Sequence, residues 1–240
     1  MSRSALILAV ALALPLTTAG RAGAHLVAGG AETLLGMMAS ADGMVVARAA
    51  AATHARGDKA AATPFLARQT VAGIAPENEF VLDAEPPILR YAELQDVLVL
   101  LARRSHGSDG VRWVSAQPAG AAIVLASPVL PERSRSVLQA LWSVAHPASG
   151  TSGDPSLAVK ALIDALSLPE QKLRALAYLD LAALASDPEH FTPVATTRLA
   201  SYGDQPGDDA QLAPAVRDVG RRLQQSGPAA AKATGEGVAR

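Results

Sequence analysis

The spacing of apolar residues changes along the chain, and the change falls near Pro131. Upstream of it, short runs rich in β-branched residues recur at intervals of roughly ten to fifteen residues, separated by turn residues. These runs lie within 44–52, 64–71, 79–84, 96–104, 111–118 and 121–127. They predict an antiparallel sheet closed into a small barrel or sandwich. A short helix is expected within 31–42, because Leu34, Leu35 and Met38 fall at helical spacing.

Downstream of Pro131 the apolar positions repeat at helical spacing instead. Helices are expected within 131–145, 154–167, 167–185, 192–203 and 208–226. Asp154 and Thr192 each precede a proline, which is the order of an N-cap and a first helical turn. Ser167 and Glu170 have capping-box spacing, which predicts that the third helix starts at Ser167. Within the apolar stripe of that helix, Asp180 is the polar exception.

The first 24 residues have the composition of a secretory signal peptide. Arg3 supplies the positive charge, Ala5–Leu16 is almost wholly apolar, and Thr17–Ala24 is small and mildly polar. The apolar run is shorter than the ~20 residues of a membrane-spanning helix. We therefore predict cleavage after Ala24 and a secreted or periplasmic mature chain. An uncleaved N-terminal anchor and a buried first helix are the alternatives.

These patterns divide the chain into a signal peptide at 1–24, a β-barrel-like domain at 25–130, a helical domain at 131–225 and a disordered tail at 226–240. The predicted fold class is α+β. In helix length, capped starts and leucine spacing, 154–185 and 192–225 resemble HEAT-like helical repeats, and a plain helical bundle is the alternative. The N-terminal half resembles the OB-like barrels of small secreted domains, including netrin-type modules. The chain lacks the cysteines of their animal members, so the resemblance implies no inhibitor function.

Composition narrows the function classes. The chain has 21 Lys and Arg against 22 Asp and Glu, which argues against a surface for polyanions. Only 3% of residues are aromatic, so platforms that stack nucleic-acid bases are not expected. The chain contains no cysteine, which rules out disulfides, thiolate zinc sites and cysteine nucleophiles. An Ala-, Arg- and Gly-rich secreted protein without disulfides is typical of a bacterial envelope.

The sharpest candidate chemistry follows from the predicted cleavage, because it would leave His25 as the first residue. A free α-amine beside its own imidazole can chelate Cu(II), and imidazole suits copper. A second histidine would have to complete the site. His54 and His106 are the preferred partners because both fall in predicted turns of the barrel, and His146 and His190 are further candidates. The alternative is that His25 is a solvated first residue.

Other constellations are weaker, and we assign no catalytic residue. Ser143 and His146 lie three positions apart on one predicted helix, without a local carboxylate to orient the imidazole. A hydrolase with a triad of residues distant in sequence stays open. Trp113 and Trp142 are expected to fill the seam between sheet and helices. Asp218 and Arg222 have the spacing of an ordinary surface pair.

The expected function is therefore non-enzymatic binding or scaffolding with a protein partner, through the helical half. Copper binding through His25 is the first alternative and a hydrolase is the second. No cofactor other than copper, no nucleic-acid partner and no stable membrane insertion after cleavage are expected.

Overall fold

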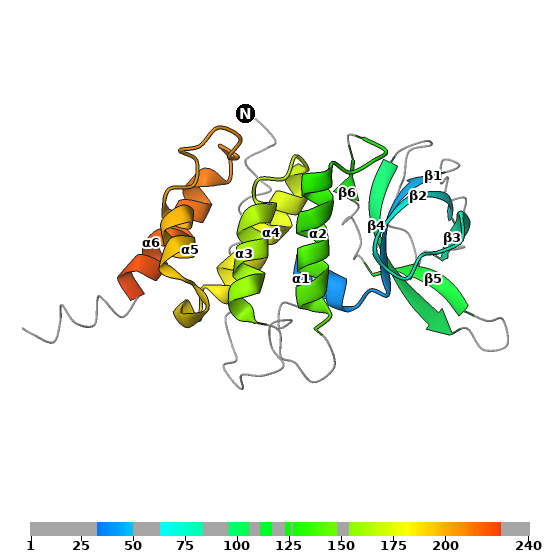
Figure 1. Ribbon diagram of the computed structural model, residues 1–240, viewed down its shortest axis with the longest axis horizontal. Coiled ribbons are helices and arrows are strands. Elements are labelled where there is room, and N and C mark those ends of the chain that lie inside the picture. Colours follow the sequence, from blue (N-terminus) through cyan, green and yellow to red (C-terminus); the bar gives the residue numbers. More distant parts are fainter. Residues whose placement is uncertain are drawn as a thin grey trace, which may run out of the picture.

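A computed structural model describes residues 33–49, 63–83, 96–105, 111–116, 123–125, 127–147 and 154–226 (Figure 1). The first elements are α1 (Leu34–Ala39), β1 (Gly43–Ala49), β2 (Thr63–Gly73), β3 (Glu79–Asp83), β4 (Asp96–Ser105), β5 (Val111–Ser115) and β6 (Ile123–Val124). The helices α2 (Glu132–Ala145), α3 (Pro155–Ala165) and α4 (Gln171–Leu184) follow, then the 3-10 turn η3 (Pro188–His190), α5 (Pro193–Ala200) and α6 (Ala213–Ser226). The barrel lies at one end of an elongated molecule and α5 and α6 at the other (Figure 1). The predicted α+β class, with a barrel before the helices, is confirmed.

The strands β1 to β5 close into a barrel in the order β1-β2-β3-β5-β4, with β4 returning to β1 and β6 extending from β4. This order fits the OB-like fold that the sequence resembles. The prediction of an antiparallel sheet needs one correction, because β3 and β5 pair in parallel. The cause is geometric: five strands in a closed ring cannot alternate in direction all the way round, so one pair must be parallel.

Strands β1 and β4 are buried on both faces. Val45 and Val99 point into the barrel interior, whereas Met44 and Leu98 belong to the apolar cluster shared with the helices. Each of these four side chains is at most 1% exposed. This double burial explains why both strands are nearly continuous apolar runs and do not alternate with polar residues.

The barrel is fixed to α2 and to the segment just before it by both packing and hydrogen bonds. The Gln139 side chain donates to the Val71 carbonyl oxygen at 3.0 Å, and the Leu130 N–H donates to the Gln69 side chain at 3.2 Å. Gly73, at the end of β2, has a φ of 71°, and a Cβ there would lie 2.6 Å from the Trp142 ring. Trp142 therefore fills the seam between barrel and helices, as predicted. Trp113 does not, because it packs against the barrel interior.

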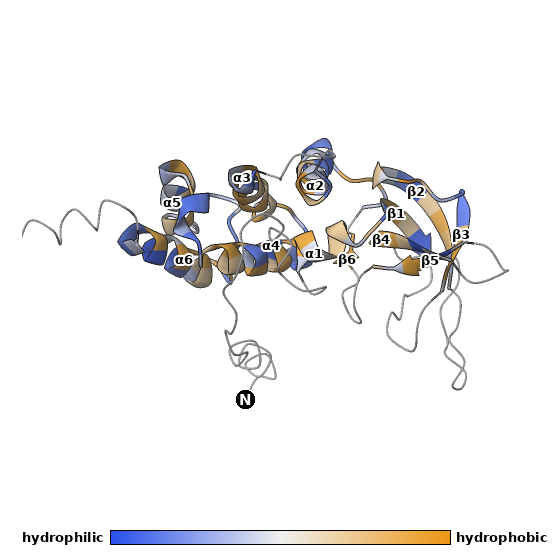
Figure 2. Cartoon of the chain, turned by 90° about the horizontal axis from the view of Figure 1, so that it is seen from below, coloured by the Kyte–Doolittle hydropathy of each residue, from blue (hydrophilic) through white to orange (hydrophobic). Residues whose placement is uncertain are grey.

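The helices form two layers, with α2, α3 and α5 above α1, α4 and α6 in Figure 2. Although α1 precedes the barrel in sequence, it packs against α2 and α4. The pairs α3–α4 and α5–α6 follow one another along the long axis of the molecule (Figure 2). The apolar cluster inside the barrel and the cluster between the barrel and the helices therefore belong to a single continuous body. In this body the helices cover one side of the barrel.

Two of the three predicted helix starts are confirmed. The Asp154 carboxylate accepts from the Ser156 N–H at 2.8 Å, and the Thr192 hydroxyl accepts from the Ala195 N–H at 3.2 Å. The predicted start at Ser167 is wrong, because α4 begins at Gln171 and its N-cap Glu170 makes no side-chain capping bond. The residue before a proline avoids helical geometry, so Pro169 delays the helix.

Within the part of the chain that the structure describes, no helix is both long and apolar enough to cross a bilayer. The predicted signal peptide at 1–24 lies outside the described residues. Of the predicted tail at 226–240, Ser226 is instead the last residue of α6, and 227–240 lie outside the described residues. Cleavage and secretion therefore stay predictions.

Candidate functional site

The three histidines predicted to bind copper lie outside the described residues. These are His25, His54 and His106. The prediction of a copper site at the mature N-terminus therefore stays a prediction.

His146 lies where α2 meets the barrel, and its ring contacts backbone on both sides of this boundary. Its Nε2 lies 3.1 Å from the Ala41 carbonyl oxygen and its Nδ1 lies 3.2 Å from the Trp142 carbonyl oxygen. The ring stacks on the Trp142 indole with centroids 4.1 Å apart. The Ser143 hydroxyl donates instead to the Gln139 carbonyl oxygen at 2.9 Å. The side chains of Ser143 and His146 thus contact backbone carbonyl oxygens and not each other, so the two residues are not arranged as a nucleophile and its base.

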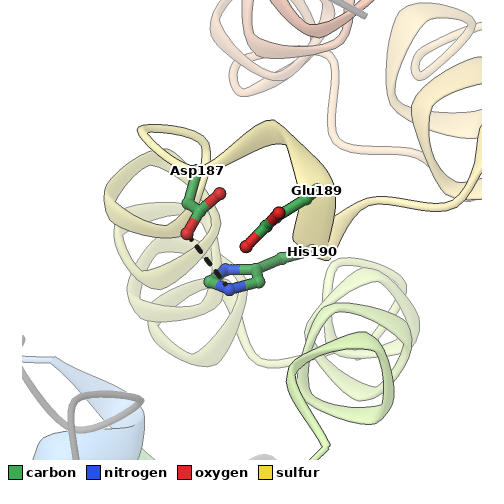
Figure 3. Close-up of side chains that lie close together, drawn as sticks. All are labelled: Asp187, Glu189 and His190. Carbon is green, nitrogen blue, oxygen red and sulfur yellow. Dashed lines mark ion pairs between the residues drawn. The ribbon is translucent and has the colours of Figure 1, made fainter. Parts of the chain in front are cut away.

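His190 lies beside two carboxylates in the turn between α4 and α5. Figure 3 shows Asp187 and Glu189 turned toward the His190 ring. The Nε2 atom of His190 lies 3.3 Å from Asp187 Oδ2, and the donor atoms of the three side chains all lie within 4.8 Å of one another. Imidazole and carboxylate groups are both zinc ligands. The three side chains could therefore contact one cation at the surface. An i,i+3 pair such as Asp187–His190 is also common at helix ends without a cation. The cluster alone therefore defines no function.

A second candidate is an open hollow on α5. It is lined by Pro193, Val194, Thr197, Arg198, Ser201 and Gln205 and has a volume of about 420 Å³. Val194, in the first turn of α5, is 78% exposed, more than any other large apolar side chain among the described residues. Arg198 borders the hollow and lies 3.3 Å from the Asp164 carboxylate of α3. The hollow thus combines an exposed apolar side chain with a charged rim.

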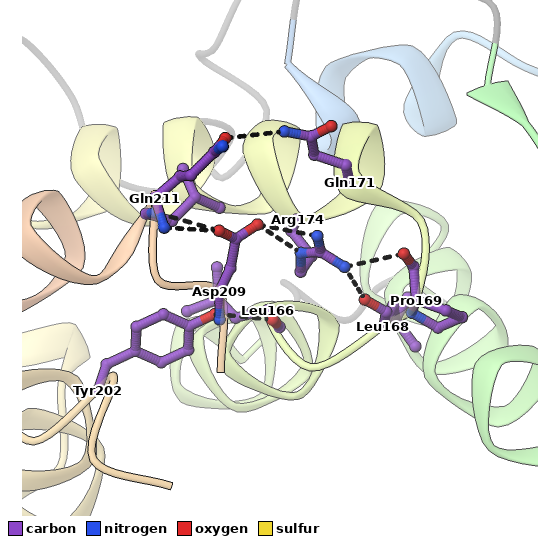
Figure 4. A network of polar contacts seen from close by, with 9 residues as sticks. Leu166, Leu168, Pro169, Gln171, Arg174, Tyr202, Asp209 and Gln211 are labelled. Atoms are coloured by element: carbon purple, nitrogen blue, oxygen red, sulfur yellow. Dashed lines mark hydrogen bonds and ion pairs between the residues drawn. The ribbon is translucent and has the colours of Figure 1, made fainter. Parts of the chain in front are cut away.

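A buried polar network joins the turn after α3 to the turn after α5 (Figure 4). Arg174 pairs with Asp209 at 2.8 Å and also donates to the Leu168 carbonyl oxygen at 2.7 Å. The Tyr202 hydroxyl donates to the Leu166 carbonyl oxygen at 2.9 Å and accepts from the Asp209 N–H at 3.0 Å. These contacts fix α5, and with it the hollow, to the preceding helix pair.

The electrostatics of this network follow from its geometry. Burial raises the pKa of Asp209, but hydrogen bonds from the Gln211 N–H and from Arg174, together with the Arg174 charge, outweigh it and lower the pKa overall. Burial also raises the pKa of the Tyr202 hydroxyl. Because its pKa is lowered, Asp209 is ionised at neutral pH and forms an ion pair with Arg174. The Asp209 side chain is only 8% exposed.

Sequence reasoning missed the Arg174–Asp209 pair, because only the fold brings α4 and the segment after α5 together. It also missed the hollow, whose lining lies wholly within 193–205, because which face of α5 stays exposed depends on how α5 packs. The sequence did mark one further buried group. Asp180 interrupts an apolar stripe of α4, and in the structure it is 5% exposed. The predicted surface pair of Asp218 and Arg222 is confirmed at 3.2 Å.

Comparison of the chain with protein-family models, with curated proteins and with solved structures returns no match.

Proposed function

We propose that this chain is a secreted or periplasmic protein without enzymatic activity that binds a protein partner through the α5 hollow. The observation that carries the proposal is the exposure of Val194, at 78%, on the wall of that hollow. A contiguous exposed apolar patch rimmed by polar groups is typical of sites that bind proteins, and in this hollow the adjacent Pro193 and Val194 supply the exposed apolar part. Arg198, on the rim, pairs with Asp164 but stays 42% exposed, so a partner can contact it from the open side of the hollow.

The shape of the hollow favours a protein ligand over a small substrate. Sites for small molecules commonly enclose 70–90% of the ligand surface. This hollow opens widely to solvent, so a small substrate bound there would stay exposed on one side. A protruding side chain of a partner fits an open hollow, because the rest of the partner covers it.

The arrangement of the helices supports a HEAT-like scaffold. The pairs α3–α4 and α5–α6 have the same order and lie in the same two layers (Figure 2). Stacked helix pairs present extended surfaces to partners, and terminal pairs have polar outer faces. The exposed face of α6 fits such an end, since it carries Asp218, Arg221, Arg222, Gln224 and Gln225. In this proposal the barrel closes the other end of the stack.

The test is affinity capture with the full mature chain from the secreted and periplasmic fractions of its source cell. Wild-type protein is compared with Val194→Asp, which places a charge in the hollow. An acidic residue in the first turn of a helix is favourable to the helix dipole, so this variant is expected to fold. If Val194 is a central contact, quantitative mass spectrometry will show one partner reduced about tenfold or more in the variant.

Val129→Asp is the matched control. Val129 is 59% exposed and lies in the turn before α2, so the same charge is added at a comparably exposed apolar position. The control variant is expected to retain the partner. Equal capture by all three proteins would overturn the proposal.

A further inference from the structure

One carboxylate of α4 caps a helix that lies far away in the sequence. Asp180 Oδ2 accepts from the Leu35 N–H at 3.1 Å, across a separation of 145 positions. The Thr33 hydroxyl and the Leu34 N–H also donate to this carboxylate. The first N–H groups of a helix lack partners within it, so Asp180 satisfies donors of α1 that α1 cannot satisfy itself.

This carboxylate is buried without a charged partner among the described residues. Asp180 is 5% exposed, and among the described residues the groups that influence its charge are its hydrogen-bond donors and the atoms that bury it. The helix α1 contains no titratable side chain. The titratable residues of α3 and of α4 itself are Lys160, Asp164, Lys172, Arg174 and Tyr178, and none of them contributes to its electrostatics.

Burial dominates the balance at Asp180. It raises the pKa from 3.8 to about 6, because the hydrogen bonds from α1, which favour the charged form, only partly offset the loss of water. At neutral pH the docked helix therefore lies against a charged group that has no counterion within the described part of the chain. Undocking of α1 would return the carboxylate to water, where its charge is better solvated.

We infer that Asp180 makes the docking of α1 on α4 depend on pH, tight when the carboxyl group is protonated and weaker when it is ionised. Between pH 3.8 and about 6 the docked state binds more protons than the undocked state. Docking therefore weakens as the pH rises through about 6 and stays weaker above it. From pH 5 to pH 7 the undocking equilibrium is expected to increase about tenfold.

Undocking of α1 would change the apolar surface of the molecule. Leu34, Leu35, Met37 and Met38 of α1 are at most 2% exposed in the docked state. Undocking uncovers them together with the faces of α2 and α4 that they cover. The molecule would therefore expose more apolar surface near neutral pH than in mild acid.

Hydrogen exchange on the full chain tests this inference. Amide protection factors in α1, corrected for the intrinsic exchange rate at each pH, are measured at pH 5 and pH 7. In the wild type they are expected to fall about tenfold between these values. Asp180→Asn keeps an acceptor for the Leu35 N–H but has no charge to solvate, so its protection should not change with pH. Amides of α6 serve as an internal reference.

Asp164→Asn is the matched control, because Asp164 is a more exposed carboxylate on the neighbouring α3. It should keep the pH response of the wild type. A wild-type protection of α1 that does not vary with pH would contradict the inference, and so would an undiminished response in Asp180→Asn. If Asp180→Asn does not fold, Asp180→Ser supplies an uncharged acceptor for the same comparison.

Discussion

At the residue scale, several positions tolerate only one kind of side chain because backbones approach closely there. Gly220 of α6 is the clearest example. A Cβ at this position would lie 2.3 Å from the Ala200 nitrogen and 2.6 Å from the Leu199 carbonyl carbon. Those atoms belong to the backbone of α5, so the two helices would have to separate to admit a methyl group.

Gly220→Ala should therefore destabilise the protein, although alanine is the better helix former. Overpacking of this kind costs about 1–3 kcal/mol, which exceeds the gain of about 1 kcal/mol in helix propensity. Urea unfolding measures the difference in free energy. Gln224→Ala, on the exposed face of the same helix, should change stability by less than about 0.5 kcal/mol. A Gly220→Ala variant as stable as the wild type would mean that α5 and α6 are not in this close contact.

At the element scale, the positions of strands and helices follow from local patterns, whereas their partners do not. The change of period near Pro131 predicted strands before it and longer helices after it, and the structure agrees. The parallel pairing of β3 with β5 depends on closure of the whole ring, and no local pattern encodes it. The packing of α1 against α4 likewise requires knowing that Asp180 faces α1. Pro169 is a local signal in the sequence that delays the start of α4 to Gln171.

The same limit applies to the candidate site. The apolar Val194 and the proline before it were visible only as the start of a helix. That Val194 stays exposed follows from which face of α5 packs against α6, since Leu199 and not Val194 meets the core. The exposed residue could thus be found only after the packing of α5 was known.

The link between helix pairs gives a prediction at this scale. Arg174 and Asp209 are 17% and 8% exposed, so removing either leaves a largely buried charge unpaired. Arg174→Met and Asp209→Asn should each cost roughly 3 kcal/mol, and the double variant should cost less than their sum by about 1–3 kcal/mol. Unfolding free energies of the four proteins in a double-mutant cycle give this coupling.

The exposed pair Asp218–Arg222 in α6 is the matched reference for that cycle. Both of its side chains are more than half exposed, so its coupling should stay within about 0.5 kcal/mol. Equal coupling energies for the two pairs would show that the Arg174–Asp209 contact does not hold the helix pairs together.

At the scale of the whole molecule, the barrel and helices share one apolar cluster through the outer faces of β1 and β4. Elements that share a core are expected to unfold together. Trp142→Phe leaves Trp113 as a fluorescent probe of the barrel, and circular dichroism at about 222 nm reports the helices. Both probes should give the same urea midpoint. Two separated transitions would contradict the single body described above.

The central functional claim is that the α5 hollow meets a protein partner, and site-specific photo-crosslinking tests it most directly. A photoreactive amino acid is placed at Val194 in one protein and at Val129 in another, and crosslinked products are identified by mass spectrometry from the native fraction. One protein is expected to be attached through position 194 and not through position 129. The same products from both positions, or none from position 194, would contradict it.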